Sequence, residues 1–195
     1  MKFKSILLAA LIAVAGASSA HAAKMWIGPT AGLGMPMGAF SDVASTGFNL
    51  GLTGDYPLNE SFVLGGEAGW HGFGGSDDFE KAQSAAIGSS VDAKVNIVPV
   101  IVHGKWMIPS GGGGMKPYLK LGLGLYRSST KVEFTGGDDT TTDTNFGYEL
   151  GAGLNYPVND NVSWGVDGAF HSIQSDGDAA NLITVRAQLH FGFGQ

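Results

Sequence analysis

Residues 183–193 read ITVRAQLHFGF, and this stretch decides the fold. Its apolar residues occupy every second position from Ile183 to Phe193, and Thr, Arg, Gln, His and Gly fill the positions between them. A period of two places successive side chains on opposite faces of a β-strand, so this strand has one apolar face. The same alternation recurs in five other stretches, which cover residues 48–56, 62–71, 119–125, 146–156 and 162–171.

Two less regular segments complete a set of eight expected strands. Between residues 91 and 106 the apolar positions are odd-numbered as far as Ile97 and even-numbered from Val98 onward. This change of phase next to Pro99 predicts a β-bulge, which also accommodates the proline. The segment from about Met25 to Met35 is rich in glycine and contains Pro29, so either phase fits it.

The expected connections alternate in length. Short turns cover residues 57–61, 109–117 and 157–161, and longer loops cover residues 36–46, 74–90, 128–145 and 174–181. With an even number of strands, the short turns and both termini fall at one end and the long loops at the other. Short periplasmic turns with long outer loops are typical of an outer-membrane barrel.

The N-terminal residues have the pattern of a secretory signal peptide. Lys2 and Lys4 precede a short apolar region, and Ala20-His21-Ala22 forms an A-x-A cleavage site. We therefore expect residues 1–22 to be removed and residues 23–195 to form one domain. The rest of the chain has no run of about 20 apolar residues, so a membrane would be crossed by strands.

The composition excludes several classes of protein. Of the 195 residues, 14% are charged, against roughly 25% in an ordinary soluble domain, and 32 are glycine. The absence of Cys excludes a disulfide-stapled scaffold and a zinc ribbon. The net charge of −6 gives no support to nucleic-acid binding.

A membrane barrel fits these strands better than a soluble one, because the polar face consists mainly of small residues without the Lys and Glu of a solvated surface. Aromatic residues also gather at both ends of the apolar stripes, as in the girdles of outer-membrane barrels, and Tyr118 and Tyr126 are counted among them. The sequence predicts an all-β, eight-stranded antiparallel up-and-down transmembrane β-barrel. The expected girdle consists of Trp26, Tyr56, Trp70, Trp106, Tyr156, Trp164, Phe191 and Phe193.

The signal peptide, the eight strands, the repeated Tyr56-Pro57 and Tyr156-Pro157 strand exits and the aromatic-rich last strand resemble the small outer-membrane β-barrel family (OmpA- and OmpX-like). The resemblance covers the whole chain after the signal peptide. It implies a monomer in the outer membrane, in contact with membrane lipids and lipopolysaccharide. It also implies that the barrel-assembly machinery reads the last strand, although Gly194-Gln195 follows Phe193 where family members usually end in Phe.

Charged residues on the polar face are expected to meet inside the barrel, since buried charges are tolerated when they are paired. The expected network consists of Asp55, Glu67, Lys94, Lys105, Lys120, Glu149, Asp167 and Arg186. His71, His103, His171 and His190 are expected to face inward as well. Because eight strands enclose little space, we interpret the network as a plug rather than as a gated pore or a proton-sensitive switch.

The outer loops and a His-Ser pair suggest further chemistry. Acidic clusters such as Asp138-Asp139 and Asp176-Gly177-Asp178 suit Ca²⁺, but neither has EF-hand spacing, so solvated loop charge is the favoured interpretation. A lipid hydrolase would need the nucleophile and base to meet, yet adjacent residues His171 and Ser172 point to opposite faces. We therefore expect no enzyme, cofactor or metal, but a role in envelope integrity or surface interaction. A narrow conduit for small or hydrophobic solutes is the alternative.

Overall fold

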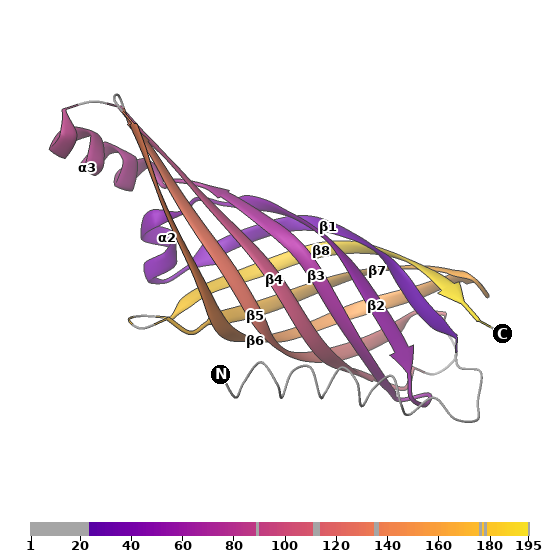
Figure 1. Ribbon diagram of the computed structural model, residues 1–195. Coiled ribbons are helices and arrows are strands. Elements are labelled where there is room, and N and C mark those ends of the chain that lie inside the picture. Colours follow the sequence, from indigo (N-terminus) through magenta and orange to yellow (C-terminus); the bar gives the residue numbers. More distant parts are fainter. Residues whose placement is uncertain are drawn as a thin grey trace.

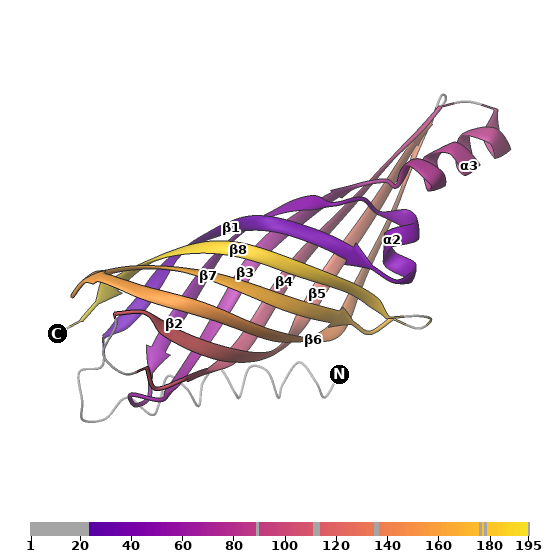
Figure 2. The ribbon, with the colours of Figure 1, turned by 180° about the vertical axis from the view of Figure 1, so that it is seen from behind.

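The computed structural model describes residues 24–88, 90–110, 114–134, 137–175, 177 and 179–194, and the expected signal peptide lies outside these residues. The described chain forms eight strands that close into one antiparallel barrel, with each strand beside its neighbours in the sequence and β1 beside β8. Figure 1 shows the tilted strands, and Figure 2 shows β8 alongside β1 where the barrel closes. The strands are β1 (Met25–Met37), β2 (Gly47–Pro57), β3 (Phe62–Gly74), β4 (Val91–Met107), β5 (Lys116–Phe134), β6 (Gly137–Asn159), β7 (Val162–Ile173) and β8 (Ala180–Phe193).

The turns at the end that holds the C-terminus are held by asparagine side chains. The Asn59 Oδ1 atom accepts hydrogen bonds from the backbone N–H groups of Ser61 and Phe62, both at 2.9 Å. The Asn159 Oδ1 atom accepts one from Asn161 N–H at 2.8 Å. Asn favours turns because its side chain can bond to backbone nearby. This chemistry explains why the same Tyr-Pro-x-Asn pattern ends both β2 and β6.

Two helices occupy the opposite end. The short helix α2 (Ala39–Val43) lies at the mouth of the barrel and buries Phe40. The helix α3 (Asp77–Ile87) begins at Ser76, whose Oγ accepts a hydrogen bond from Phe79 N–H at 3.3 Å, and ends at Gly88 with φ of 75°. Its acidic first turn complements the helix dipole. Figure 1 places α3 beyond the barrel mouth beside β4, to which the Glu80 carboxylate bonds through Ala93 N–H at 3.0 Å. None of the described helices is both long and apolar enough to cross a membrane.

β4 corrects the expectation of a bulge. It keeps one register with β5 from Val91 to Met107, and its odd-numbered residues are buried along its whole length. Val91, Val95 and Ile97 therefore face the barrel interior, although the sequence interpretation placed all apolar residues on the lipid side. The phase of the strand does not change at Pro99. The inward residues are apolar from Val91 to Ile101 and polar at His103 and Lys105.

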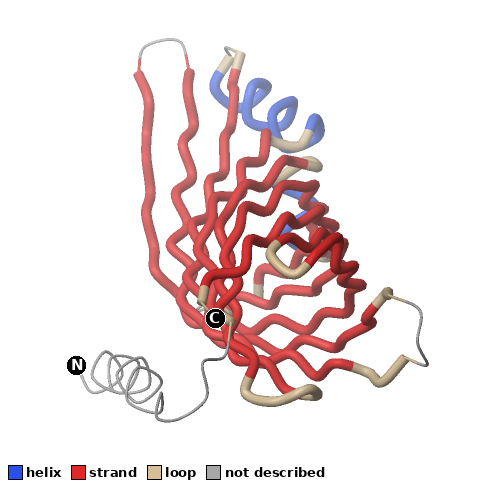
Figure 3. The backbone as a smooth tube through the Cα atoms, turned by 90° about the vertical axis from the view of Figure 1, so that its right-hand side faces the viewer, coloured by secondary structure: helices blue, strands red, loops and turns tan. Residues whose placement is uncertain are grey.

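β5 and β6 correct a second expectation. Residues 128–145, expected as a loop, continue the two strands as a hairpin whose pairs run from Ser128↔Asp143 to Phe134↔Gly137. Figure 3 shows this pair of strands extending past the rest of the barrel. The alternation lapses there because neither face of the hairpin is buried, so neither face needs apolar side chains.

Candidate functional site: the filled lumen

The inward face of each strand places charged side chains on the barrel axis. The structure brings together seven of the eight expected residues, from seven strands. They are Asp55 on β2, Glu67 on β3, Lys105 on β4, Lys120 on β5, Glu149 on β6, Asp167 on β7 and Arg186 on β8, and each is at most 9% exposed. Strand alternation alone positions them, since each follows the inward phase of its own strand.

Arg186 lies at the centre of this network. Its Nη1 atom donates to Glu67 at 2.8 Å and its Nη2 atom to Glu149 at 3.1 Å. Its Nε and Nη2 atoms donate to the two Asp167 oxygens, both at 3.0 Å. Such fork-shaped pairing with a carboxylate is both strong and geometrically specific. One guanidinium thus joins β3, β6, β7 and β8 across the lumen.

Lys120 contacts the same three carboxylates from the other side. Its Nζ atom lies 2.5 Å from Glu149, 3.1 Å from Asp167 and 3.3 Å from Glu67. This inner cluster therefore has three carboxyl groups around two cations. The cluster therefore has one more acidic group than basic groups. Glu149 differs from the other two carboxyl groups because its Oε2 atom is buried without a hydrogen-bond partner among the described residues.

A second group lies nearer the short turns. The Lys105 Nζ atom donates to Asp55 Oδ2 at 2.6 Å, and the His103 Nε2 atom lies 2.9 Å from Asp55 Oδ1. The other ring nitrogen of His103 is 4.0 Å from Glu67, which connects this group to the inner cluster. Gly65 makes room for it, since a Cβ there would lie 2.4 Å from His103 Nε2 and 2.5 Å from Asp55 Oδ1.

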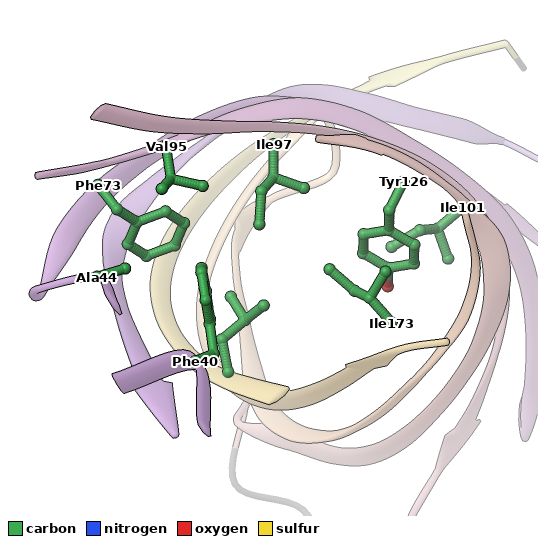
Figure 4. Packing of buried hydrophobic residues seen from close by; sticks show 9 residues of the cluster. Phe40, Ala44, Phe73, Val95, Ile97, Ile101, Tyr126 and Ile173 are labelled. Carbon is green, nitrogen blue, oxygen red and sulfur yellow. The ribbon is translucent and has the colours of Figure 1, made fainter. Parts of the chain in front are cut away.

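An apolar layer closes the lumen on the outer side of the network. His171 is fully buried between the Tyr126 hydroxyl and Thr184 Oγ1, each 3.0 Å from one of its ring nitrogens. Beyond it, Figure 4 shows side chains from several strands and from α2 pointing into the barrel. This apolar cap consists of Phe40, Ala44, Phe73, Val95, Ile97, Ile101, Tyr126, Ile173 and Leu182.

Lys94, the eighth residue expected in the network, lies outside the lumen. It occupies an even-numbered position of β4, on the outward face, and its side chain is 52% exposed. There it pairs with Asp92 at 3.6 Å and with Glu133 at 3.8 Å. The error follows directly from the expected bulge, which would have turned Lys94 inward.

Trp26 is the exception among the expected girdle residues. It pairs in register with the inward-facing Asp55 and lines a cavity inside the barrel. The glycines and Pro29 of β1 had left the phase of this strand open. Tyr118 and Tyr126 also face inward and are buried, because aromatic residues fill space in this lumen as well as at the bilayer boundary.

The remaining girdle residues lie on the outward face near the strand ends, with Tyr56 half-buried and the others exposed. Between the two ends, the outward face is aliphatic, as at Leu52, Leu121 and Val185. That these aromatics mark the two bilayer boundaries stays a prediction. The residues concerned are Tyr56, Trp70, Trp106, Tyr156, Trp164, Phe191 and Phe193.

The protruding hairpin carries its own exposed ion pairs. The Lys131 Nζ atom lies 2.9 Å from Glu133 and 3.3 Å from Asp138. The hydrogen bond from Lys131 holds the pKa of the Glu133 carboxyl below its ordinary value. Because these groups are solvated, such pairs add little stability. The outer end as a whole remains acidic, with Asp77, Asp139 and their neighbours exposed.

His171 and Ser172 have different hydrogen-bond partners. His171 bonds to Tyr126 and Thr184, whereas Ser172 Oγ accepts a hydrogen bond from Gln174 at 3.2 Å. Of the acidic clusters considered for Ca²⁺, Asp176 and Asp178 lie outside the described residues. Within the described ranges, His, Asp and Glu side chains form no group of three suited to a metal ion.

Together, a closed barrel, an aliphatic outward face and a charge-paired interior define an integral outer-membrane β-barrel. The chain belongs to the outer membrane protein beta-barrel domain family, which it matches over residues 6–191. The short turns, the start of β1 and the end of β8 therefore face the periplasm, and α2, α3 and the hairpin face the cell exterior.

Several solved structures share this fold. Neisserial surface protein A is 16% identical, with a TM-score of 0.61 over 87% of this chain and 97% of that chain. A major outer membrane protein from Thermus thermophilus is 14% identical, with a TM-score of 0.59 over 89% and 100%. Ail, the attachment invasion locus protein of Yersinia pestis, is 18% identical, with a TM-score of 0.53 over 88% and 97%. At these identities the likeness supports the fold alone. No curated protein sequence matches the chain significantly.

Proposed function

We propose that this protein is a closed barrel that acts in envelope integrity and surface interaction, and that it is neither a pore nor an enzyme. The observation that carries the proposal is the position of Arg186, which bridges three carboxylates from three strands across the lumen. Removing one partner of such a buried group costs about 3–5 kcal/mol, so the network is held shut at rest. The apolar cap adds a second barrier, because ions cross dehydrated apolar constrictions poorly.

Single-channel recording tests the closed lumen. We expect the unmodified barrel in a planar bilayer to show no stable conductance steps. The double variant Glu67→Ala/Arg186→Ala removes one buried cation and one buried anion, which leaves the apolar cap as the remaining barrier, and we expect its leak current to exceed that of the unmodified barrel. Lys94→Ala/Glu133→Ala removes an equal pair from the surface and serves as the matched control. Stable steps from the unmodified protein would overturn the proposal.

A narrow conduit is the second candidate, and one observation favours it. A cavity of about 210 Å³ lies inside the periplasmic end of the barrel. It ends at the Asp55–Lys105 pair, beyond which lies the inner cluster around Arg186 and Lys120. Solute transport would require both the network and the cap to open, and solute uptake by liposomes containing the barrel would decide for this candidate.

For the surface role, β6 offers an exposed sheet edge. β6 pairs with β5 from Gly137 onward but pairs with β7 only from Gly147 onward. On its other side, residues 137–145 therefore have no strand partner within the described part of the chain, whereas the Phe146 carbonyl accepts a hydrogen bond from Gln174 N–H. Exposed edges pair with extended segments of other chains. Because Asp138, Asp139 and Asp143 line this edge, we propose a basic extended segment as its partner.

The same charges argue against a sulfated polyanion. A structure of Ail exists in complex with the heparin analogue sucrose octasulfate. The outer end of the present chain carries mostly acidic side chains, which would repel such a ligand. Fluorescence anisotropy with a labelled lysine-rich peptide and with a labelled sulfated oligosaccharide distinguishes the two. Preferential binding of the oligosaccharide would contradict the proposed partner.

The remaining elements of the proposal concern export and surroundings. We propose cleavage after Ala22, recognition of the strand ending at Phe193 by the barrel-assembly machinery, and a monomer. Divalent cations would link the acidic outer end to lipopolysaccharide phosphates. Catalysis would show as a change in lipid A mass on expression that His171→Ala abolishes, and we expect no such change.

A further inference from the structure

The periplasmic cavity has walls of two kinds. Trp26, Val63 and Met107 give it an apolar surface, and Tyr118 lies toward its inner end beside the Asp55–Lys105 pair. The exposed residues Asn59, Glu60 and Lys116 stand at its mouth. The cavity is separate from the inner charge cluster, and the closed-lumen proposal assigns it no role.

Three polar atoms on its wall have no hydrogen-bond partner among the described residues. They are Asn155 Oδ1 on β6, Ser163 Oγ on β7 and His190 Nε2 on β8. Ser163 and His190 are register partners, and Asn155 pairs with Gly165 two residues along β7, so the three form one patch. Ser163 is 2% exposed and His190 is 4% exposed.

This patch holds three of the eight buried side-chain atoms that have no hydrogen-bond partner among the described residues. Buried polar side chains nearly always have a hydrogen-bond partner, and an unpaired one destabilises the fold. His190 Nε2 has its nearest acidic neighbour, Asp55 Oδ2, at 3.8 Å, which is too long for a hydrogen bond. All three side chains line one side of the cavity, and because the acceptor, the hydroxyl and the ring nitrogen are themselves buried, a ligand reaches them through a small rotation of these side chains.

We propose that this cavity binds a neutral, single-ring molecule bearing a hydroxyl or amide group. A dry cavity of about 150 Å³ holds one benzene molecule, so about 210 Å³ suits one ring with a small substituent. The ring packs between Trp26 and the aliphatic wall, and its polar group bonds to Asn155, Ser163 and His190.

The charges of the site favour a neutral ligand. Asp55 and Lys105 neutralise each other at 2.6 Å, and a charged ligand would have to separate them. At the mouth, Glu60 and Lys116 are of opposite sign. A neutral ligand leaves the Asp55–Lys105 pair intact and gains from apolar burial and from the unpaired polar patch together.

Protein-observed NMR with p-cresol and toluene tests the proposal. The two probes share one ring and one methyl group, and only p-cresol has a hydroxyl. We expect p-cresol to shift the amide resonances of Gly165 and His190 saturably in the full barrel in micelles. We expect its midpoint to be at least about tenfold below that of toluene, because toluene leaves the polar patch unpaired.

Two variants give the matched comparison. Asn155→Leu preserves side-chain size and removes the acceptor, so p-cresol should bind several-fold more weakly while toluene is unaffected. Asn49→Leu makes the same change in a buried position on β2 outside the cavity and should leave both midpoints unchanged. Compact migration of unboiled protein on a gel confirms that each variant is folded.

Three outcomes would overturn the proposal. These are equal midpoints for the two probes, shifts that rise linearly and spread over lipid-facing residues such as Leu189, and an unchanged p-cresol midpoint in Asn155→Leu. If Asn155→Leu does not fold, the comparison of the two probes on the unmodified protein still decides. The result is independent of the conductance test, since a closed barrel can hold or lack this ligand.

Discussion

At the scale of single residues, the three carboxyl groups of the inner cluster differ in how many of their oxygens accept hydrogen bonds. Glu67 and Asp167 use both carboxylate oxygens on Arg186 and Lys120. Glu149 uses Oε1 alone, and its Oε2 atom has no partner among the described residues. The three carboxyl groups are therefore not equivalent, although all three are buried in the same cluster.

This difference predicts that Glu149→Gln is tolerated far better than Glu67→Gln. The first removes the excess negative charge and keeps an acceptor at the Oε1 position. The second removes an anion whose loss leaves Arg186 short of a partner, at a cost of about 3–5 kcal/mol. Urea unfolding in micelles measures both, and we expect Glu149→Gln to change the free energy of unfolding by less than about 1 kcal/mol. Equal destabilisation by the two variants would contradict the assignment.

At the scale of the strands, close packing of the lumen depends on which glycines face inward. A Cβ at Gly65 would collide with the Asp55–His103 pair, whereas one at Gly104 on β4 would meet nothing within 4 Å. Both glycines lie in strands and both substitutions add one methyl group. They differ in whether that methyl group has space.

We therefore expect Gly65→Ala to destabilise the barrel by about 1–3 kcal/mol, the usual effect of overpacking. Gly104→Ala, on the lipid side, is the control and should be neutral or slightly stabilising. The unfolding midpoint of each variant in the same detergent gives the comparison. A neutral Gly65→Ala would show that the Asp55–His103 pair can shift to accept the methyl group.

We predict that the protruding hairpin can be deleted without unfolding the barrel. Replacing residues 129–142 by Asn-Gly joins Ser128 to Asp143, which are already register partners. Because the removed residues are half-buried on β5 and exposed on β6, the barrel should keep its compact gel migration and most of its stability. The same variant should lose binding of the lysine-rich peptide. Loss of the folded barrel would mean that the hairpin contributes to assembly.

The strands also show which parts of the structure the sequence could predict. Where one face meets lipid and the other a polar interior, as along β8, alternation predicts both the strand and its phase. At Ile97 both faces are apolar, so the sequence interpretation inferred a bulge and turned Lys94 inward. At residues 128–145 neither face is buried, so alternation vanishes although the strands continue. Around Trp26, the glycines and Pro29 of β1 interrupt the alternation, so the sequence does not indicate which face of the strand carries Trp26.

At the scale of the whole molecule, the interior changes along the barrel axis. A mixed polar and apolar cavity lies at the periplasmic end, the ion-pair cluster in the middle and the apolar cap at the outer end. The cap could not be predicted from the sequence, because Phe40 comes from α2 and Phe73 lies beyond the stretch of β3 in which the alternation is visible. The composition, in contrast, is explained by the architecture. The narrow interior favours glycine, and the lipid-facing exterior disfavours charged residues.

Closure of the barrel predicts heat-modifiable migration. With every strand paired to two neighbours, unboiled protein should run as a compact species on a denaturing gel, and boiling should slow it. Glu67→Ala/Arg186→Ala should convert to the slow form at a lower temperature than Lys94→Ala/Glu133→Ala does. A single band at all temperatures would count against a closed barrel.

The length of the hairpin also sets a distance. On β5, Phe134 stands eight residues beyond Tyr126, which corresponds to roughly 25 Å of strand. A molecule that pairs with the tip is therefore held up to that distance beyond the level of Tyr126. Shortening the hairpin by two residues per strand would lower that attachment point by roughly 7 Å without altering its chemistry, so reach and affinity can be varied independently.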